Sequence, residues 1–317
     1  MKLGVHMLAY NVSRFIGPVI ENAGPHVDRI YIAYSRRAFG YNPAKRDSPN
    51  PTRREELLAT RFAHKTVVID GDWELDEQAR NACLDRARQD GCDYLLVQDA
   101  DEFYPEQSWA ANIAALAAVK ETRTYKTAWY NFWKTPEYVV EYANGTIVDY
   151  NASFAVPCDS NIRFSRKRST TDGHDTGILP GICHHFGYVL TDEEMLQKIS
   201  TWSHTTDMFN LQGWYRFKWL GWTPETKNLH VAYPPEWRRA IRFEGTRPHY
   251  GASLELSLSE RPKSRFHWLG DGAYDAGVAL RVACRRLKRS VPPLWTKTGG
   301  AGKGSTGSTG GSTRFAS

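Results

Sequence analysis

Residues 94–103 read Tyr94-Leu95-Leu96-Val97-Gln98-Asp99-Ala100-Asp101-Glu102-Phe103, an apolar run that breaks into carboxylates. The run Tyr94–Val97 is typical of a buried strand. Asp99 and Asp101 follow two positions apart, so both carboxylates can turn toward one point just past the strand. Carboxylate oxygens suit Mg²⁺ or Mn²⁺, which also take oxygens from substrate phosphates. Because ligands of open α/β sheets bind beyond the carboxyl ends of strands, the stretch predicts a metal and diphosphate site.

An acidic pair of this kind is also common in loops and at helix caps, so the surrounding chain has to support the metal interpretation.

The chain has 317 residues, of which 41% are hydrophobic and 24% charged, enough for one large or two smaller globular domains. No apolar run approaches the roughly 20 residues of a membrane helix. Residues 1–6 lack the apolar core of a signal peptide and predict a first strand. Five scattered cysteines without a Cys-x-x-Cys pair favour a reducing, cytoplasmic compartment, whether bacterial, viral or of a host cell.

Positive charge gathers at the C-terminal end. The chain has a formal net charge of +6, and residues 261–317 alone carry eleven Lys or Arg and two acidic residues. Such asymmetry is typical of contact with nucleic acid, phosphorylated surfaces or anionic lipid. A solvated tail kept soluble by its charge explains it equally well. No feature of the sequence predicts an oligomeric state.

Strands and helices are expected to alternate over the first hundred residues. Strands are predicted at 3–10, 29–34, 66–69 and 94–97, with helices at about 13–23 and 74–90. This alternation predicts an α/β fold with a mostly parallel, Rossmann-like sheet. None of these strands is followed by a Gly-x-Gly-x-x-Gly fingerprint or a Walker loop, so neither a dinucleotide enzyme nor a P-loop ATPase is supported.

The sequence pattern changes after a helix expected at 109–120. Short aromatic, β-prone runs follow at 126–133, 138–142, 146–149, 153–156 and 161–164, and a further strand at 181–189. Thr191 and Glu194 form a capping-box pattern that opens a helix to about residue 203. An aromatic helical stretch lies near residues 214–222. These runs predict a mixed-sheet extension that covers the ligand cleft.

Domain boundaries follow from these patterns. Residues 1–268 should form one body, with a nucleotide-binding half (1–108) and an acceptor half (109–268). Residues 269–298 should be a basic helical segment, with an amphipathic helix over 271–290. Residues 299–317 are rich in Gly, Ser and Thr and predict a disordered tail.

Taken together, four features resemble a nucleotide-sugar glycosyltransferase of the GT-A fold, in the family-two-like group. They are Tyr10-Asn11 after the first strand, Arg80-Asn81 in the helix before the central strand, residues 98–103, and His184-His185 on a later strand. The resemblance covers about residues 3–240. It implies a mixed, mostly parallel sheet flanked by helices, a UDP-sugar as the foremost donor, and Mn²⁺ or Mg²⁺. The chain departs from the pattern where many relatives have Asp-Asp-Gly-Ser, since it has Tyr34-Ser35-Arg36-Arg37 there.

The resemblance also implies roles for the metal ligands. Asp99 and Asp101 are expected to hold the cation, with Asp101 binding it directly. A His on a later strand often completes the protein's ligands in similar enzymes. His185 is favoured here over His184, because strand alternation places the two on opposite faces. Either could instead be an ordinary polar or core histidine.

Donor contacts are the next group of expected roles. The candidates for holding the nucleotide and diphosphate are Tyr10, Asn11, Asp70, Arg80, Asn81 and Lys198. A guanidinium and an amide suit a diphosphate sugar, and Asp70 could bond to the base or ribose. Exposed helix positions and core packing are the ordinary alternatives for these residues.

An inverting transfer needs a carboxylate to deprotonate the acceptor hydroxyl. Besides Asp101 in the reaction centre, Asp159 and Asp175 are the leading candidates, with Asp172 and Glu137 also open. A retaining enzyme requires no such base.

The acceptor stays open between two classes. One is a hydroxylated base in DNA, as in phage-type DNA modification, which the basic C-terminal region and the Arg-rich loop at 36–54 favour. The other is a glycan, a lipid-linked sugar or a small molecule. A third hypothesis is a non-catalytic module that only binds a nucleotide sugar.

Overall fold

The computed structural model describes residues 1–173, 176–201, 210–246, 256 and 267–290. The chain divides into two compact units, Met1–Asp275 and Ala276–Ser317. All strands and the site described below belong to the first unit. The described part of the second unit is the later portion of the helix α6 (His267–Ser290). The expected tail at 299–317 lies outside the described residues.

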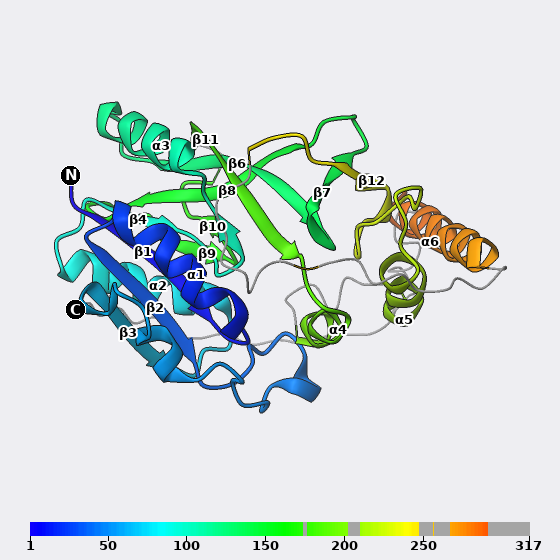
Figure 1. Cartoon of the computed structure of the whole chain (residues 1–317), viewed down its shortest axis with the longest axis horizontal. Coiled ribbons are helices and arrows are strands. Elements are labelled where there is room, and N and C mark those ends of the chain that lie inside the picture. Colours follow the sequence, from blue (N-terminus) through cyan, green and yellow to red (C-terminus); the bar gives the residue numbers. More distant parts are fainter. Residues whose placement is uncertain (174–175, 202–209, 247–255, 257–266, 291–317) are drawn as a thin grey trace, which may run out of the picture. The chain divides into compact units, whose positions relative to one another are not determined.

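The N-terminal half alternates strands and helices as expected (Figure 1). Its elements are β1 (Leu3–Ala9), α1 (Ser13–Ala23), β2 (Arg29–Ser35), β3 (Thr66–Gly71), α2 (Asp76–Gln89) and β4 (Tyr94–Val97). β1 pairs in parallel with both β2 and β4, and β2 pairs in parallel with β3. Gly91, with φ +69°, follows the end of α2, where a left-handed residue lets the chain leave the helix.

The second half is richer in strands. Its elements are β5 (Glu102–Phe103), α3 (Glu106–Ala118), β6 (Thr124–Trp133), β7 (Thr135–Tyr142), β8 (Val148–Pro157), β9 (Phe164–Arg166), β10 (Ser169–Thr170), β11 (Thr176–Tyr188), α4 (Asp192–Thr201), α5 (Leu211–Trp214), a π-helical stretch (Tyr215–Leu220) and β12 (Trp237–Arg242). The runs expected at 146–149 and 153–156 form the single strand β8. The run expected at 161–164 was misplaced, since β9 begins only at Phe164.

One ten-stranded sheet unites both halves, in the order β12-β7-β6-β8-β4-β1-β2-β3, and off this path β11 pairs with both β6 and β5. β8 runs antiparallel to β4 and to β6, so it connects the parallel strands of the first half to the strands of the second half. β11 pairs in parallel with β6. The predicted fold class, an α/β fold with a mixed sheet flanked by helices, is confirmed.

Helices cover both faces of the parallel half, with α1 on one face and α2 on the other (Figure 1). Ala79, Cys83 and Ala87 lie on one face of α2 and are fully buried. They pack with Tyr31 and Val97 in a core cluster under the sheet. This core fixes where α2 begins and therefore where Arg80 lies. None of the helices in the described part of the chain is both long and apolar enough to cross a membrane.

Candidate active site

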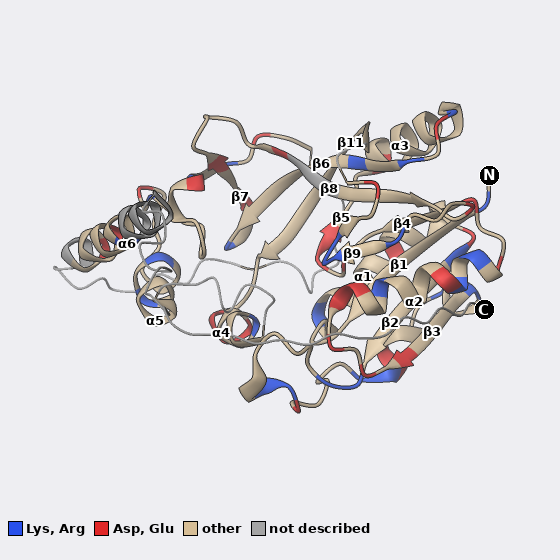
Figure 2. Cartoon of the chain, turned by 180° about the vertical axis from the view of Figure 1, so that it is seen from behind, with Lys and Arg blue, Asp and Glu red and all other residues tan. Residues whose placement is uncertain are grey.

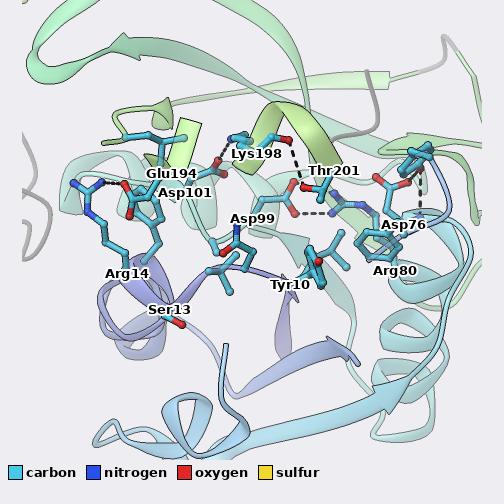
Figure 3. Close-up of a pocket in the computed structure, with 18 residues that line it drawn as sticks. Tyr10, Ser13, Arg14, Asp76, Arg80, Asp99, Asp101, Glu194, Lys198 and Thr201 are labelled. Atoms are coloured by element: carbon cyan, nitrogen blue, oxygen red, sulfur yellow. Dashed lines mark hydrogen bonds and ion pairs between the residues drawn. The ribbon is translucent and has the colours of Figure 1, made fainter. Parts of the chain in front are cut away.

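A cavity of about 410 Å³ opens beyond the carboxyl ends of β1 and β4 (Figure 3). Segments far apart in the sequence meet there: the exit of β1, the first turn of α1, the loop after β2, the start of α2, the loop after β4, and α4. The lining residues are Leu8, Tyr10, Asn11, Val12, Ser13, Arg14, Phe15, Phe39, Tyr41, Asp76, Arg80, Asp99, Ala100, Asp101, Leu190, Glu194, Lys198 and Thr201. The location agrees with the general rule for open α/β sheets.

Two groups from the second half of the chain lie beside Asp101. Lys198 Nζ donates to Asp101 Oδ2 at 2.9 Å, and His185 Nε2 lies 3.6 Å from Asp101 Oδ1. Burial disfavours the ionised carboxylate, but Lys198, by its charge and its hydrogen bond, and His185 together outweigh burial and lower the pKa of Asp101. Asp101 is therefore an anion at neutral pH and can bind a cation.

His185 suits metal coordination. Burial lowers the pKa of His185 to about 4, so the imidazole is neutral near pH 7. Its ligand nitrogen lies within 4.8 Å of carboxylate oxygens of both Asp101 and Glu102. A carboxylate and a neutral imidazole are a suitable donor set for Mn²⁺ or Mg²⁺, with further oxygens supplied by substrate and water. The residues present thus fit a divalent cation at Asp101 and His185.

Asp99 occupies a different environment from Asp101. Arg80 grips both of its oxygens, with Nη1 at 2.8 Å and Nη2 at 2.9 Å, as the dashed lines in Figure 3 show in part. Burial opposes ionisation, yet Arg80 and Arg168 outweigh it and hold the pKa of Asp99 well below its usual range. The structure groups Asp101 and His185 with Glu102 rather than with Asp99. Glu102 is thus grouped with the pair although both of its oxygens accept from Arg168, and a role for Asp99 as a metal ligand stays a prediction.

Sequence reasoning missed Arg168, which lies in the turn between β9 and β10. It donates to both oxygens of Glu102, to the Ser153 carbonyl at 2.8 Å and to the Val97 carbonyl at 3.1 Å. Figure 2 shows the acidic residues at β5 beside the basic residues at the end of β9. Arg168 therefore locks the loop after β4 to β8. No local signal could have found it, since 66 residues separate it from Glu102.

Aromatic residues from the loop after β2 form one wall of the cavity. Phe39 and Tyr41 line it, and Tyr41 Oη donates to Asp76 Oδ1 at 2.5 Å. Burial raises the pKa of Asp76. These three residues were not expected at the site. Their flat rings and single carboxylate are the kind of surface that can stack on and orient a nucleotide base.

The first turn of α1 forms the opposite wall. It contains no acidic residue, and Val12 at its N-cap provides no side-chain cap. Asn11 adopts φ +57°, and its backbone N–H donates to Asn50 Oδ1 at 3.0 Å, which turns the chain sharply from β1 into the helix. The helix dipole places partial positive charge at this turn, where an anion is stabilised.

Some of the residues predicted for the site line the cavity, and others do not. Tyr10, Asn11, Arg80, Asp99, Asp101 and Lys198 line the cavity. Asn81 instead clamps β9, since its amide donates to and accepts from the Phe164 backbone. Asp70 pairs with Arg54 and is not among the lining residues.

The candidate bases are placed away from the cavity where the structure describes them. Asp159 is exposed and follows β8 at the amino end of β4, the opposite end of the sheet from Asp101. Asp172 accepts from the Thr124 backbone and hydroxyl at the start of β6. Glu137 is exposed on β7. Asp175 lies outside the described residues.

Comparison with protein-family models and with curated proteins gave no match. Among solved structures, the chain is similar to mannose-1-phosphate geranyltransferase from Thermus thermophilus, with 16% identity, a TM-score of 0.31, and coverage of 50% of this chain and 51% of that one. It is also similar to 4-diphosphocytidyl-2C-methyl-D-erythritolsynthase from Anaerococcus prevotii (10% identity, TM-score 0.34, covering 62% and 93%) and to the inositol-1-phosphate CTP transferase of T. maritima (10%, 0.35, covering 62% and 95%). The chain thus spans about half the length of the first of these. Because these TM-scores are all below 0.5, the fold class is assigned from the strand order of the sheet and not from these neighbours.

Proposed function

We propose that this chain is a metal-dependent glycosyltransferase that moves a sugar from a nucleoside-diphosphate sugar, with a UDP-sugar the foremost candidate, to an acceptor hydroxyl. One observation carries the proposal. The Asp101 carboxylate and Lys198 line a cavity whose other wall is the first turn of α1, and His185 lies 3.6 Å from Asp101. A cation site and a helix N-terminus across one cavity are the two features that a diphosphate requires.

Asp101 and His185 would hold Mn²⁺ or Mg²⁺, with Glu102 nearby. When bound, such an ion stabilises the negative charge that develops on the leaving diphosphate. Lys198 contributes a second positive charge at the same place. The turn at Val12 and Ser13 binds the far side of the diphosphate through the helix dipole.

The nucleotide base is proposed to lie between Tyr10 and the aromatic pair Phe39 and Tyr41. These residues replace the contacts that the Asp-Asp-Gly-Ser pattern would supply after the second strand. Asp76 is half-buried beside them and accepts from Tyr41, so it can orient a polar edge of the base.

An inverting reaction needs a carboxylate that deprotonates the acceptor hydroxyl. Asp159 is remote from the cavity, which leaves Asp175 as the proposed general base if the reaction inverts configuration. A retaining reaction would proceed without one.

The arginine-rich loop at 36–54 was expected to favour a DNA acceptor. Its arginines are paired within the chain: Arg37 with Asp47, Arg46 with Glu74, and Arg54 with Asp70. Charge neutralised in this way adds little to phosphate binding. A DNA acceptor therefore rests on the basic C-terminal region, and a glycan, lipid-linked or small-molecule acceptor stands beside it. Cys83, Cys92, Cys158 and Cys183 are buried free thiols, which suits the proposed cytoplasmic location.

A donor-by-acceptor screen tests the proposal. Radiolabelled UDP-, GDP- and dTDP-sugars are incubated with Mn²⁺ and with modified DNA, unmodified DNA, glycans or no acceptor. Label in one acceptor class identifies the reaction, and slow metal-dependent donor hydrolysis without acceptor identifies a transferase. Donor binding with neither transfer nor hydrolysis would indicate the non-catalytic module instead.

A further inference from the structure

A hydrogen-bonded chain runs behind His185, on the side away from Asp101. His185 Nδ1 lies 2.5 Å from Asn131 Oδ1, and Asn131 Nδ2 lies 2.5 Å from Tyr142 Oη. The Tyr142 hydroxyl in turn bonds to Asp149. The four residues come from four strands, β11, β6, β7 and β8.

Backbone register holds these side chains in place. Asn131 is the direct partner of His185 in the parallel pair of β6 and β11. Asn131 is only 4% exposed, so its amide must find its partners within the protein. The Trp129 ring lies 4.7 Å from the His185 ring, and Asp149 is the register partner of Trp129 across β6 and β8. The imidazole is therefore confined both by a ring beside it and by a bond behind it.

The direction of each hydrogen bond follows from Asp149. A carboxylate can only accept, so Tyr142 donates its hydroxyl proton to Asp149. The Tyr142 oxygen then accepts from an N–H of Asn131, which sets the Asn131 amide with its Oδ1 toward His185. An amide oxygen also only accepts, so His185 must carry its proton on Nδ1.

We propose that Asp149, Tyr142 and Asn131 are positioning residues that fix His185 as the Nδ1–H tautomer and aim its Nε2 lone pair at Asp101. This inference rests on the proposed function for its consequence, because a metal ligand needs that lone pair free. The 3.6 Å gap between Nε2 and Asp101 Oδ1 agrees with two acceptors that share no proton. Outer hydrogen bonds of this kind are known to set the tautomer and basicity of ligating histidines.

Histidine-selective ¹⁵N NMR of the full, metal-free chain at pH 7 tests the tautomer directly. A His185→Gln variant assigns the resonances. The wild type should show the Nδ1–H form. Tyr142→Phe removes the acceptor of the Asn131 amide, so the amide is free to flip and His185 should shift toward the Nε2–H form. Asp149→Asn should shift the His185 tautomer in the same direction. It replaces Tyr142→Phe as the test variant if Tyr142→Phe does not fold.

Tyr130→Phe is the matched control. Tyr130 lies next to Asn131 on β6 but packs against His184 and Phe243, so its hydroxyl is outside the chain of bonds. It should leave the His185 spectrum unchanged. An Nε2–H tautomer in the wild type, or an unchanged tautomer in both Tyr142→Phe and Asp149→Asn, overturns the inference.

Mn²⁺ titration followed by EPR gives a second readout. Tyr142→Phe should weaken Mn²⁺ binding by about tenfold or more, as losses of outer-shell partners do. A tautomer that responds to the variants in a wild type that binds no Mn²⁺ would support the positioning role and defeat the metal part of the proposed function. The two ideas therefore fail separately.

Discussion

Lys198 Nζ donates to Asp101 Oδ2 and to the Gly187 carbonyl, both at 2.9 Å, and so ties helix α4 to the loop after β4 and to the end of β11. The two side chains are 97 residues apart in the sequence. The ammonium offsets the charge of a carboxylate that burial would otherwise penalise. Lys198 thus both shapes the proposed cation site and adds positive charge to it.

Asp101→Asn should abolish metal-dependent donor hydrolysis and transfer while the protein stays folded. The amide keeps the shape of the carboxylate but loses the charge that holds a cation, and the residue lies past the end of β4 rather than in the core. Donor turnover and the melting temperature, measured on the same samples, separate the two effects. Activity close to that of the wild type would remove the metal role from Asp101.

Lys198→Met should weaken donor binding much more than Lys198→Arg does. Methionine keeps the aliphatic stem but removes the charge beside Asp101 and the diphosphate, whereas arginine retains it. Calorimetric titration with UDP in the presence of Mn²⁺ should show a loss of about tenfold or more for Met, since a charge-assisted bond contributes roughly 1.5–3 kcal/mol. Equal affinities in the two variants would place Lys198 outside the donor site.

Gly187→Ala should disturb the site without unfolding the chain. A Cβ at this position would come within 2.7 Å of His185 Nε2 and 3.3 Å of Lys198 Nζ, so both groups must move. We expect weaker Mn²⁺ binding. Gly17→Ala is the control, because nothing lies within 4 Å of its Cβ and it sits inside α1, where alanine should stabilise the helix by up to about 1 kcal/mol. Unchanged Mn²⁺ affinity in Gly187→Ala would contradict the geometry.

Arg168→Met should destabilise the fold strongly. It leaves the buried Glu102 without its positive partner, whereas Asp99 keeps Arg80, and breaking a buried pair from one side costs about 3–5 kcal/mol. Arg166→Met, an exposed neighbour on β9, should change stability by less than about 0.5 kcal/mol. Urea denaturation measures both. Similar midpoints for the two variants would show that Arg168 does not hold the loop.

His6 should make stability depend on pH below about 6.5. Burial, reinforced by Arg80, lowers the pKa of His6 well below its usual value, so the unfolded chain takes up this proton first as the pH falls. Stability is then lost on acidification by up to about 1.4 kcal/mol per pH unit from this group, and nothing is lost above the unfolded pKa. His6→Gln retains an acceptor near Arg80 without titrating. Its stability between pH 4.5 and 6.5 should fall less steeply than that of the wild type, and a parallel decline would contradict this account.

Local patterns predicted the first half of the fold well. The apolar run before Asp99 is β4, and the helix expected at about 13–23 is α1. The capping box is also confirmed, since the Thr191 N–H donates to Glu194 Oε2 and the Glu194 N–H to Thr191 Oγ1. These signals act within a few residues, which is why the sequence reveals them.

Partners far apart in the chain could not be predicted. Arg168 reaches Glu102 only because a short hairpin, β9 and β10, folds under the sheet. Asn81 was expected to contact a donor, but α2 packs against β9 and its amide is used there instead. The different partners of the two carboxylates, Arg80 for Asp99 and Lys198 for Asp101, are likewise decided by tertiary packing.

The most direct measurement is anomalous diffraction from a crystal soaked with Mn²⁺ and UDP. The account predicts a manganese peak within about 2.3 Å of an Asp101 oxygen and of His185 Nε2, with the diphosphate between the ion and the first turn of α1. A diphosphate bound elsewhere, or no manganese at Asp101 while UDP occupies the cavity, would contradict it.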